Sequence, residues 1–412
     1  MQRKKQEDKM EKIFPIVVKT MQSLEPLLAK EMIALGATEV EEGRRVVRAN
    51  CDLETLYKIN YRARLALRVL CPLHSFQIRK ADDLYNKAYE MPWEEYLHAD
   101  TTFAIDPQIS SSMFTHSHFP SLRVKDAIAD RLKKVYGSRP DVNPESPDVQ
   151  IHLLIDQEKV QISLDSSGRS LNQRGYRVNG GEAPMNEVLA AGIIAITGWK
   201  GETPLYNPFC GSGTIAFEAA YAALNIPAQK AYPKFNFQTW LNFDDALWMT
   251  VHGDANALIE NKELTIVASD IDYDQLNVAR KNGKNLPFND AIRFEKSDFF
   301  SEDSVPEVPG LVVLNPPYGE RMEIEELEKI YSEIGSVFKH RYSGSTAWII
   351  SSDLQALHAI GLRQKRKVKL MNGKLECELR GIDLFRGKRN ERFEIKPTDS
   401  ENLSPDSHTS EA

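Results

Sequence analysis

The chain has 412 residues, of which 42% are hydrophobic and 27% are charged, so it is long enough to form two or three domains of roughly 150 residues each. Its formal net charge of -7 excludes a uniformly basic nucleic-acid-binding protein, although basic residues can still collect on one face. No stretch approaches the roughly 18 apolar residues of a membrane span, and residues 1–11 form a polar, flexible leader with no apolar segment behind it, so we expect a cytoplasmic protein.

The first 70 residues contain short apolar runs separated by amphipathic segments. Residues 24–35 have the apolar spacing of a helix, with Ser23 as its expected N-cap, and a second helix is predicted from Asp52 to about Tyr61. Strands are predicted at residues 13–19, 46–50 and 64–70. This order of strands and helices predicts a small ferredoxin-like module over residues 12–70.

A second module is predicted over residues 58–165. Its expected elements are helices at residues 82–90 and 121–136, a strand at 101–106, and a hairpin of residues 149–156 and 159–165 that turns at Gln157-Glu158. The pattern resembles the THUMP domain in Phe103, in residues 124–128 and in residues 162–165. The resemblance implies an RNA-binding α/β module that shares the helix and strand near residues 58–70 with the first module.

The remainder of the chain has the alternation of a doubly wound domain. Apolar strands are expected around Leu205, Ile266, Ile292, Val312 and Trp348, with helices between them, which predicts βαβ units and a parallel sheet. Two alternating runs about Asn372-Gly373 predict a terminal hairpin at the sheet edge. We assign residues 166–387 to this domain and expect residues 388–412 to form a disordered acidic tail.

Two other groups of side chains bear on which ligands the protein can bind. The four cysteines, Cys51, Cys71, Cys210 and Cys377, lack paired metal-ligand spacing, so we expect ordinary buried thiols and no metal. Residues 229–245 form an insertion rich in aromatic side chains. This insertion is expected to be a lid or a packing element more than a platform for base stacking.

A glycine-bearing turn at residues 207–214 follows one of the predicted strands and precedes a helix. Gly211 and Gly213 remove side chains where the backbone must bend and a ligand can approach, and the helix presents free N–H groups at its start. The glycines are not followed by Lys-Ser/Thr and lack the third glycine of a dinucleotide loop, so phosphate is not the obvious ligand. Asp270 ends the next strand and suits a ribose hydroxyl pair, with Asp272 as a second candidate, although either can instead cap the following helix.

The tetrapeptide Asn315-Pro316-Pro317-Tyr318 follows another apolar strand. An exocyclic amine on a base is a poor nucleophile because its lone pair is delocalised into the ring. The side-chain carbonyl of Asn315 and the backbone carbonyl of Pro316 can each accept one N–H and direct the lone pair at a methyl donor. Tyr318 can stack on a planar target that has left its own stack. Alone, the tetrapeptide could be a rigid turn, but with the glycine turn and the strand-end carboxylate it indicates an active site.

These motifs resemble those of class I S-adenosylmethionine-dependent methyltransferases that act on exocyclic amines. The resemblance implies an α/β fold with a C-terminal Rossmann-like methyltransferase domain, preceded by the ferredoxin-like and THUMP modules, and S-adenosylmethionine as the cofactor. It also implies that Asp298 accepts a hydrogen bond from the adenine amine and that Phe299 packs on the ring. The implied catalytic residues are Asn315, Pro316, Pro317 and Tyr318. The implied cofactor-binding residues are Asn207, Pro208, Phe209, Cys210, Gly211, Ser212, Gly213, Thr214, Asp270, Asp272, Asp298 and Phe299.

Basic residues concentrate in several clusters that suit contacts with RNA phosphates, although each cluster could also be a solvated face. The clusters lie at residues 58–80, 123–134, 169–177 and 363–369. Arg62 and Arg64 in the first cluster are predicted to contact phosphates. Arg174 and Arg177 belong to an Arg-Gly-Tyr-Arg segment that, in the family resembled, lies beside the cofactor and the target base.

The combination of motifs resembles the 23S ribosomal RNA guanine-N2 methyltransferase family over residues 12–387. Some members carry a second methyltransferase domain at the C-terminus, and because none follows here we expect one activity. The alternatives are guanine-N2 methylation of transfer RNA, adenine-N6 methylation of RNA, a protein-glutamine methyltransferase, and an RNA-binding protein with a vestigial pocket. The sequence does not indicate an oligomeric state.

Overall fold

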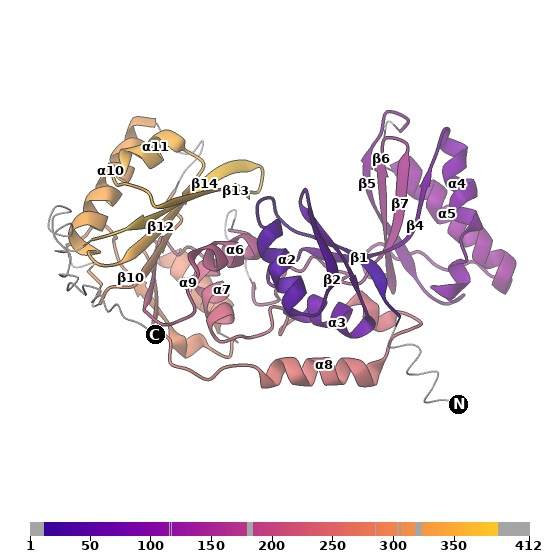
Figure 1. Ribbon diagram of the computed structural model, residues 1–412, viewed down its shortest axis with the longest axis horizontal. Coiled ribbons are helices and arrows are strands. Elements are labelled where there is room, and N and C mark those ends of the chain that lie inside the picture. Colours follow the sequence, from indigo (N-terminus) through magenta and orange to yellow (C-terminus); the bar gives the residue numbers. More distant parts are fainter. Residues whose placement is uncertain are drawn as a thin grey trace, which may run out of the picture.

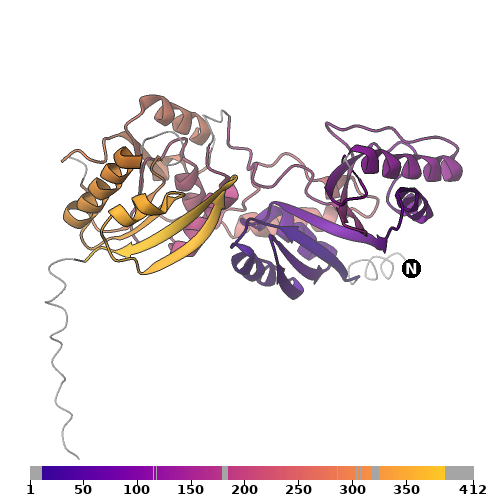
Figure 2. The ribbon, with the colours of Figure 1, turned by 90° about the horizontal axis from the view of Figure 1, so that it is seen from above.

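The computed structural model describes residues 12–114, 116, 118–178, 184–284, 286–302, 305–306, 308–317 and 324–385. These residues form an N-terminal body and a C-terminal body, which are the two ends of the elongated molecule in Figures 1 and 2. Each body is built on one seven-stranded sheet. The predicted leader, residues 1–11, and the predicted tail, residues 388–412, lie outside the described residues.

The first part of the N-terminal body has ferredoxin-like topology. Its elements are β1 (Phe14–Lys19), α2 (Glu25–Ala34), β2 (Thr38–Gly43), β3 (Val46–Cys51), α3 (Leu53–Arg62) and β4 (Arg68–Gln77). The strand order is β2-β3-β1-β4, and each neighbouring pair is antiparallel. As predicted, Asp52 caps α3 by accepting a hydrogen bond from the backbone N of Thr55 at 2.8 Å.

Three details of this module differ from the sequence prediction. Strand β2 was not predicted because its residues are mostly exposed and lack alternating apolar side chains. The third predicted strand begins at Arg68 rather than at Arg64. Leu24, not Ser23, is the N-cap of α2, and it provides no side-chain hydrogen bond.

The second part of the N-terminal body continues the same sheet. It adds α4 (Ala81–Glu90), η1 (Trp93–Glu95), β5 (Phe103–Ser110), α5 (His118–Tyr136), β6 (Val149–Asp156) and β7 (Lys159–Asp165). The hairpin of β6 and β7 has the predicted bounds. Strand β4 pairs with β1 near Arg68 and with β7 from Leu70 to Gln77, so a single strand belongs to both parts.

A polar cluster joins distant strands of this sheet. The Nζ atom of Lys19 on β1 lies 2.6 Å from Nε2 of His152 on β6 and donates to Oε1 of Gln108 on β5 at 3.0 Å. His152 is 2% exposed, and burial, followed by the nearby Lys19 charge, lowers the pKa of its imidazole to about 4. The neutral imidazole therefore accepts a hydrogen bond from the lysine ammonium.

The C-terminal body is a sheet with helices on both faces (Figure 1). Its helical segments are α6 (Glu187–Thr197), α7 (Thr214–Ala223), η2 (Asn236–Thr239), α8 (Asp245–Ala257), α9 (Tyr273–Gly283), η3 (Asn289–Ala291), α10 (Ile324–Arg341) and α11 (Leu354–Ala359). Its strands are β8 (Leu205–Pro208), β9 (Ile266–Asp270), β10 (Ile292–Lys296), β11 (Leu311–Leu314), β12 (Thr346–Ser351), β13 (Arg366–Asn372) and β14 (Leu375–Asp383).

The strand order of this sheet is β10-β9-β8-β11-β12-β14-β13. Neighbouring strands are parallel except where β14 pairs with β12 and β13. Consecutive residues of β11 point into different layers: Val313 packs in the cluster that includes α6 and α7, and Val312 packs in the cluster that includes α10 and α11. Because the parallel strands run in the same direction, their carboxyl ends share one edge of the sheet, where ligands bind in folds of this kind.

The aromatic insertion joins the two bodies. Phe237 of η2 stacks on Tyr57 of α3 with ring centroids 4.4 Å apart, and Trp248 of α8 meets Tyr61 of α3 edge-on at 5.5 Å. Helix α8 lies along α3, away from the sheet of its own body (Figure 1). Of the roles expected from the sequence, the structure gives this segment the packing role.

The lowered pKa of His152 should make the folded protein less stable in acid. We expect the free energy of unfolding to fall as the pH drops from 6.5 toward 4, because the unfolded chain takes up a proton on this imidazole and the folded chain does not. The variant His152→Gln keeps an acceptor for Lys19 but does not titrate, so its loss over this interval should be smaller by up to about 3 kcal/mol. Urea unfolding of both proteins at several pH values measures the difference, and parallel pH profiles would contradict the prediction.

Candidate active site

The turn between β8 and α7 has a strained, open backbone. Phe209, Gly211 and Gly213 all have positive φ angles, of 58°, 53° and 85°. A Cβ built on Gly211 would meet nothing within 4 Å, whereas one on Gly213 would lie 2.9 Å from the ring of Phe217. Glycine is therefore needed at the two positions for different reasons: Gly211 leaves space beside the backbone, and Gly213 lets α7 pack closely.

The carboxylate that ends β9 holds this turn. Asp270 accepts hydrogen bonds from the backbone N of Gly211 at 2.9 Å and of Asp272 at 3.0 Å. Asp272 is the N-cap of α9 and accepts from the backbone N of Asp274 at 2.8 Å. The capping alternative thus describes Asp272, while Asp270 remains the predicted ribose ligand beside the open glycine.

Two asparagines present unpaired oxygens near this edge of the sheet. Asn207 is fully buried and donates from Nδ2 to the carbonyl of Val313 at 2.9 Å, but its Oδ1 has no partner among the described residues. Asn315 directly follows β11, and its Oδ1 is likewise buried without a partner in the described part of the chain. A buried acceptor left unpaired costs about 1–3 kcal/mol, so both positions suit a ligand that brings an N–H or O–H group. Tyr318, the last residue of the predicted catalytic motif, lies outside the described residues.

Asp298 and Phe299 follow β10 and differ in their surroundings. Asp298 is exposed and accepts a hydrogen bond from the backbone N of Phe300 at 2.9 Å. Phe299 is 4% exposed and packs against the rings of Phe209, Phe338 and Tyr342. Phe299 therefore packs in the core beneath the turn, and its contact with adenine stays a prediction.

Arg174, which was predicted to bind substrate, is buried among contacts within the protein. It is 1% exposed, and its guanidinium donates to the carbonyls of Leu171, at 2.7 Å, and of Arg64 and to the carboxylate of Glu218 in α7, at 3.4 Å. A buried guanidinium is stable only when its donors are satisfied in this way. Arg174 is therefore a structural link between the two bodies.

Arg64 and Arg62 also lie at the junction of the bodies. Arg64 donates to the carbonyls of Tyr221 at 3.1 Å and Ile226 at 2.8 Å, near the C-terminal end of α7, and burial lowers the pKa of its guanidinium. The half-buried Arg62 donates to Oδ1 of Asn225 at 3.4 Å. The donors of Arg64 therefore satisfy backbone carbonyls inside the protein, and Arg62 points into the same junction. Their contact with phosphates stays a prediction.

Arg177 does lie beside the glycine turn. Its guanidinium forms an ion pair with Glu187 at 3.0 Å and donates to the carbonyl of Met185 at 3.0 Å and to Oγ1 of Thr214 at 3.3 Å. Burial raises the pKa of the Glu187 carboxyl. Arg177 therefore connects the first residue of α7 with the segment that opens α6.

Asn282, which was not predicted as a site residue, holds the same turn from the other side. Asn282 is 3% exposed in α9; its Oδ1 accepts from the backbone N of Val178 at 3.0 Å and its Nδ2 donates to the carbonyl of Ser212 at 3.4 Å. It lies on the buried side of α9 with Leu276 and Ala279. A polar residue on an otherwise apolar helix stripe was the available signal.

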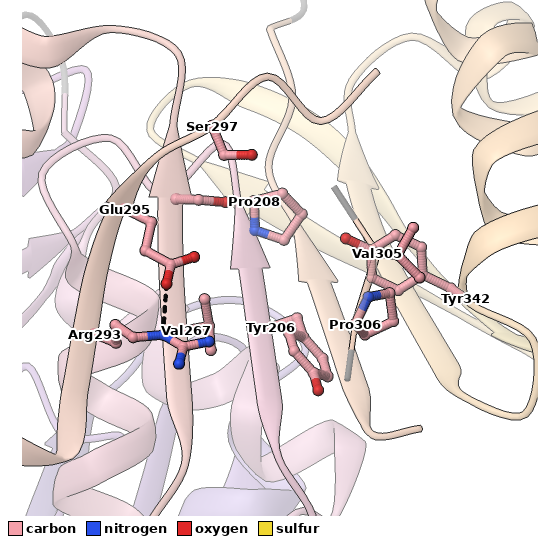
Figure 3. Close-up of a pocket in the computed structure, with 10 residues that line it drawn as sticks. Tyr206, Pro208, Val267, Arg293, Glu295, Ser297, Val305, Pro306 and Tyr342 are labelled. Carbon is pink, nitrogen blue, oxygen red and sulfur yellow. Dashed lines mark ion pairs between the residues drawn. The ribbon is translucent and has the colours of Figure 1, made fainter. Parts of the chain in front are cut away.

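A cavity of about 300 Å³ lies on the other face of the sheet (Figure 3). Side chains from β8, β9 and β10 line it together with residues 305–306 and Tyr342, and Arg293 and Glu295 form an ion pair at 2.5 Å in its wall. Tyr206 and Val267 in this wall pack with the α10 layer, on the face opposite α7. Of the predicted cofactor-binding residues, only Pro208 is among those that line the cavity.

The sheet order, with its reversed β14, and the three strand-end motifs define a class I methyltransferase domain. The family model described as RMKL-like, methyltransferase domain matches residues 174–381, the THUMP domain model matches residues 79–165, and the RlmL ferredoxin-like domain model matches residues 15–70. The chain belongs to the RMKL-like methyltransferase family. The predicted fold class, a Rossmann-like methyltransferase domain preceded by ferredoxin-like and THUMP modules, is confirmed.

Similar proteins extend over most of the chain. "Ribosomal RNA large subunit methyltransferase K/L" of Syntrophotalea carbinolica is 38% identical over 88% of this chain and 52% of its own length. "Putative RNA methyltransferase slr0064" of Synechocystis sp. is 36% identical over 90% of this chain and 97% of its own length. The crystal structure of SMU.472 complexed with SAH is 27% identical, with a TM-score of 0.83 over 92% of this chain and all of that one. The chain thus spans about half the length of the K/L relatives it matches.

Two further observations concern the described residues alone. None of their helices is long and apolar enough to cross a membrane. Nowhere in those same residues do three or more His, Cys, Asp or Glu side chains gather where they could hold a metal ion.

The position of Asn282 makes a prediction for cofactor binding. Asn282→Leu removes both hydrogen bonds at similar volume, so the turn loses a constraint, and we expect SAH to bind about 10-fold more weakly, the scale of one or two hydrogen bonds. Asn282→Asp retains the acceptor for Val178, so its SAH affinity should lie between those of the wild type and Asn282→Leu. Isothermal titration calorimetry with SAH measures the affinity.

The control for this experiment is Asn256→Leu, which removes a polar contact between α8 and Tyr61 and leaves the turn untouched. If Asn282→Leu only lowers the melting temperature and binds SAH as tightly as the control, Asn282 does not position the turn.

Proposed function

We propose that this chain is an S-adenosylmethionine-dependent methyltransferase that transfers a methyl group to the exocyclic N2 amine of a guanine in 23S ribosomal RNA. The observation that carries the proposal is the buried, unpaired Oδ1 of Asn315 at the carboxyl edge of the sheet. Relatives named as large-subunit ribosomal RNA methyltransferases, and the matched THUMP domain, support RNA as the substrate. The choice of guanine N2 rests on the resemblance of the motifs to that family.

The residues at the glycine turn fit the cofactor. S-adenosylmethionine would supply an electrophilic methyl group on its sulfonium sulfur. Gly211 leaves open space beside the backbone, and the half-buried Asp270 offers a carboxylate next to it. Asn207 contributes a second unpaired acceptor, and Arg177 and Asn282 hold the turn in place. SMU.472, similar over nearly the whole chain, was crystallised with SAH.

Catalysis by these residues is a matter of positioning. Oδ1 of Asn315 and the carbonyl of Pro316 accept the two N–H groups of the target amine, so its lone pair points at the methyl group. Pro316 offers a carbonyl without a competing N–H donor, and Pro317 stiffens the same backbone. After transfer the amine loses one proton and becomes neutral again. The proposed site needs no metal, and the proposed setting is the cytoplasm.

The first prediction from this mechanism concerns Asn315. We expect Asn315→Ala to lower kcat by about 100-fold or more, the scale of losing one positioned hydrogen-bonding group, while SAH affinity changes little. Asn315→Asp retains an acceptor oxygen and serves as the matched control, with a smaller loss. If Asn315→Ala loses SAH affinity in proportion to its activity, the side chain belongs to the cofactor site and its catalytic role is refuted.

The second prediction concerns the substrate. With labelled S-adenosylmethionine, we expect the protein to label unmodified 23S RNA but not separate pools of 16S RNA and transfer RNA, and nucleoside analysis to identify N2-methylguanosine. Label in transfer RNA would keep the chemistry and replace the substrate, and N6-methyladenosine would overturn the base assignment. A protein that binds SAH but labels no RNA pool would refute the proposed function.

A further inference from the structure

The β13–β14 hairpin overhangs the catalytic edge of the sheet. Strand β14 pairs with β12 only from Glu378 onward, where Glu378 lies opposite the last β12 residue, Ser351. Residues 375–377 therefore extend past β12, by about 10 Å at the usual rise per residue. Because β14 runs opposite to the parallel strands, this overhang lies at their carboxyl ends, where Asn315 follows β11.

Basic side chains line the outer strand of this hairpin and its flanks. The cationic edge, as we call it, consists of Arg363, Lys365, Arg366, Lys367, Lys369 and Lys374, all exposed. Two members have acidic partners: Lys365 pairs with Asp383 at 3.0 Å and Lys367 reaches Glu378 at 4.0 Å. Within the described residues Lys369 and Lys374 form no ion pair. The overhanging end thus carries Lys374 in its turn and Lys369 at its base, with Glu376 as the exposed acid between them.

Several members of the other predicted basic clusters already have partners within the protein. Lys58 pairs with Glu54 at 2.5 Å, and Arg68 pairs with the buried Asp165. Arg64 and Arg174 satisfy backbone carbonyls at the junction of the bodies. The cationic edge keeps most of its charge in solvent, and its overhanging end reaches the catalytic edge.

We propose that the cationic edge binds the phosphate backbone of the RNA next to the target nucleotide. The inference rests on the proposed RNA substrate and adds a surface to it. In the strand order β11-β12-β14-β13, the edge lies three strands from Asn315, or about 14 Å across the sheet, so it contacts flanking nucleotides and not the target base. Figures 1 and 2 both show the hairpin pointing toward the ferredoxin-like module, so an RNA strand lying on it continues toward the N-terminal body.

The double variant Lys369→Gln and Lys374→Gln tests this surface. Each phosphate contact to a single strand contributes about 0.7 to the slope of log affinity against log salt, so the variant's slope should be shallower by about 1.4. The matched control is the double variant Lys200→Gln and Lys262→Gln, which removes two charges before β8 and β9, at the opposite edge of the same sheet, and breaks an exposed ion pair of little energetic value. Filter binding of unmodified 23S RNA over a range of sodium chloride concentrations measures the slopes, and SAH affinity should be equal in all proteins.

A double variant with the slope of the wild type overturns the inference. If that variant also self-associates in gel filtration, the role of the two lysines is to keep the edge strand β13 from pairing with other chains. The outcome is separable from that of the proposed function. If the salt slopes differ as expected but the wild type transfers no methyl group, the RNA surface is kept and the enzyme assignment is rejected. If the wild type transfers methyl groups but the slopes are equal, the enzyme assignment is kept and the RNA surface is rejected.

Discussion

The guanidinium of Arg174 is the contact on which the arrangement of the two bodies depends. It is buried between the backbone of the ferredoxin-like module, at Arg64, and the carboxylate of Glu218 in the middle of α7. Removing one partner of such a group leaves an uncompensated charge in the interior, at a cost of about 3–5 kcal/mol. Because α7 begins at the glycine turn, the same contact ties this turn to the N-terminal body, so the two cannot shift independently.

The local structure was predictable wherever short-range signals decided it. Residues adjacent in sequence determine the hairpin of β6 and β7 and the cap at Asp52. The Asn372-Gly373 turn likewise predicts the hairpin of β13 and β14. Strand β2 was missed because it lies at a sheet edge and presents glutamates and a threonine instead of alternating apolar residues. Its place is set by pairing with β3 across the short turn at residues 44–45, and the exposed side chains of β2 do not signal that pairing.

The candidate site also contains some residues whose positions the sequence predicts and others whose contacts it does not. Asn315 and Asp270 could be placed because each ends an apolar strand of a parallel sheet, and such ends share one edge. The internal contacts of Arg64 and Arg174 were not predicted, because an arginine looks alike in sequence whether it faces a phosphate or a buried backbone carbonyl. Phe299 became a core residue through Phe338 and Tyr342, which come from a helix and loop about 40 positions later. Contacts of this kind depend on the assembled fold and have no local signal.

Strand β4 has a consequence for how this architecture can be divided. Its first residues complete the ferredoxin-like sheet and the rest begin the THUMP sheet, without an intervening loop. A fragment that ends at residue 70 would keep the pairing to β1 but lose most of the strand. One that starts there would keep the pairing to β7 but lose the ion pair of Arg68 with Asp165 and the hydrogen bonds of Val69 with Ser166 and Ser167. Either cut exposes backbone N–H and C=O groups that pair readily with other chains. The two modules are therefore expected to be inherited, expressed and exchanged between proteins as one unit.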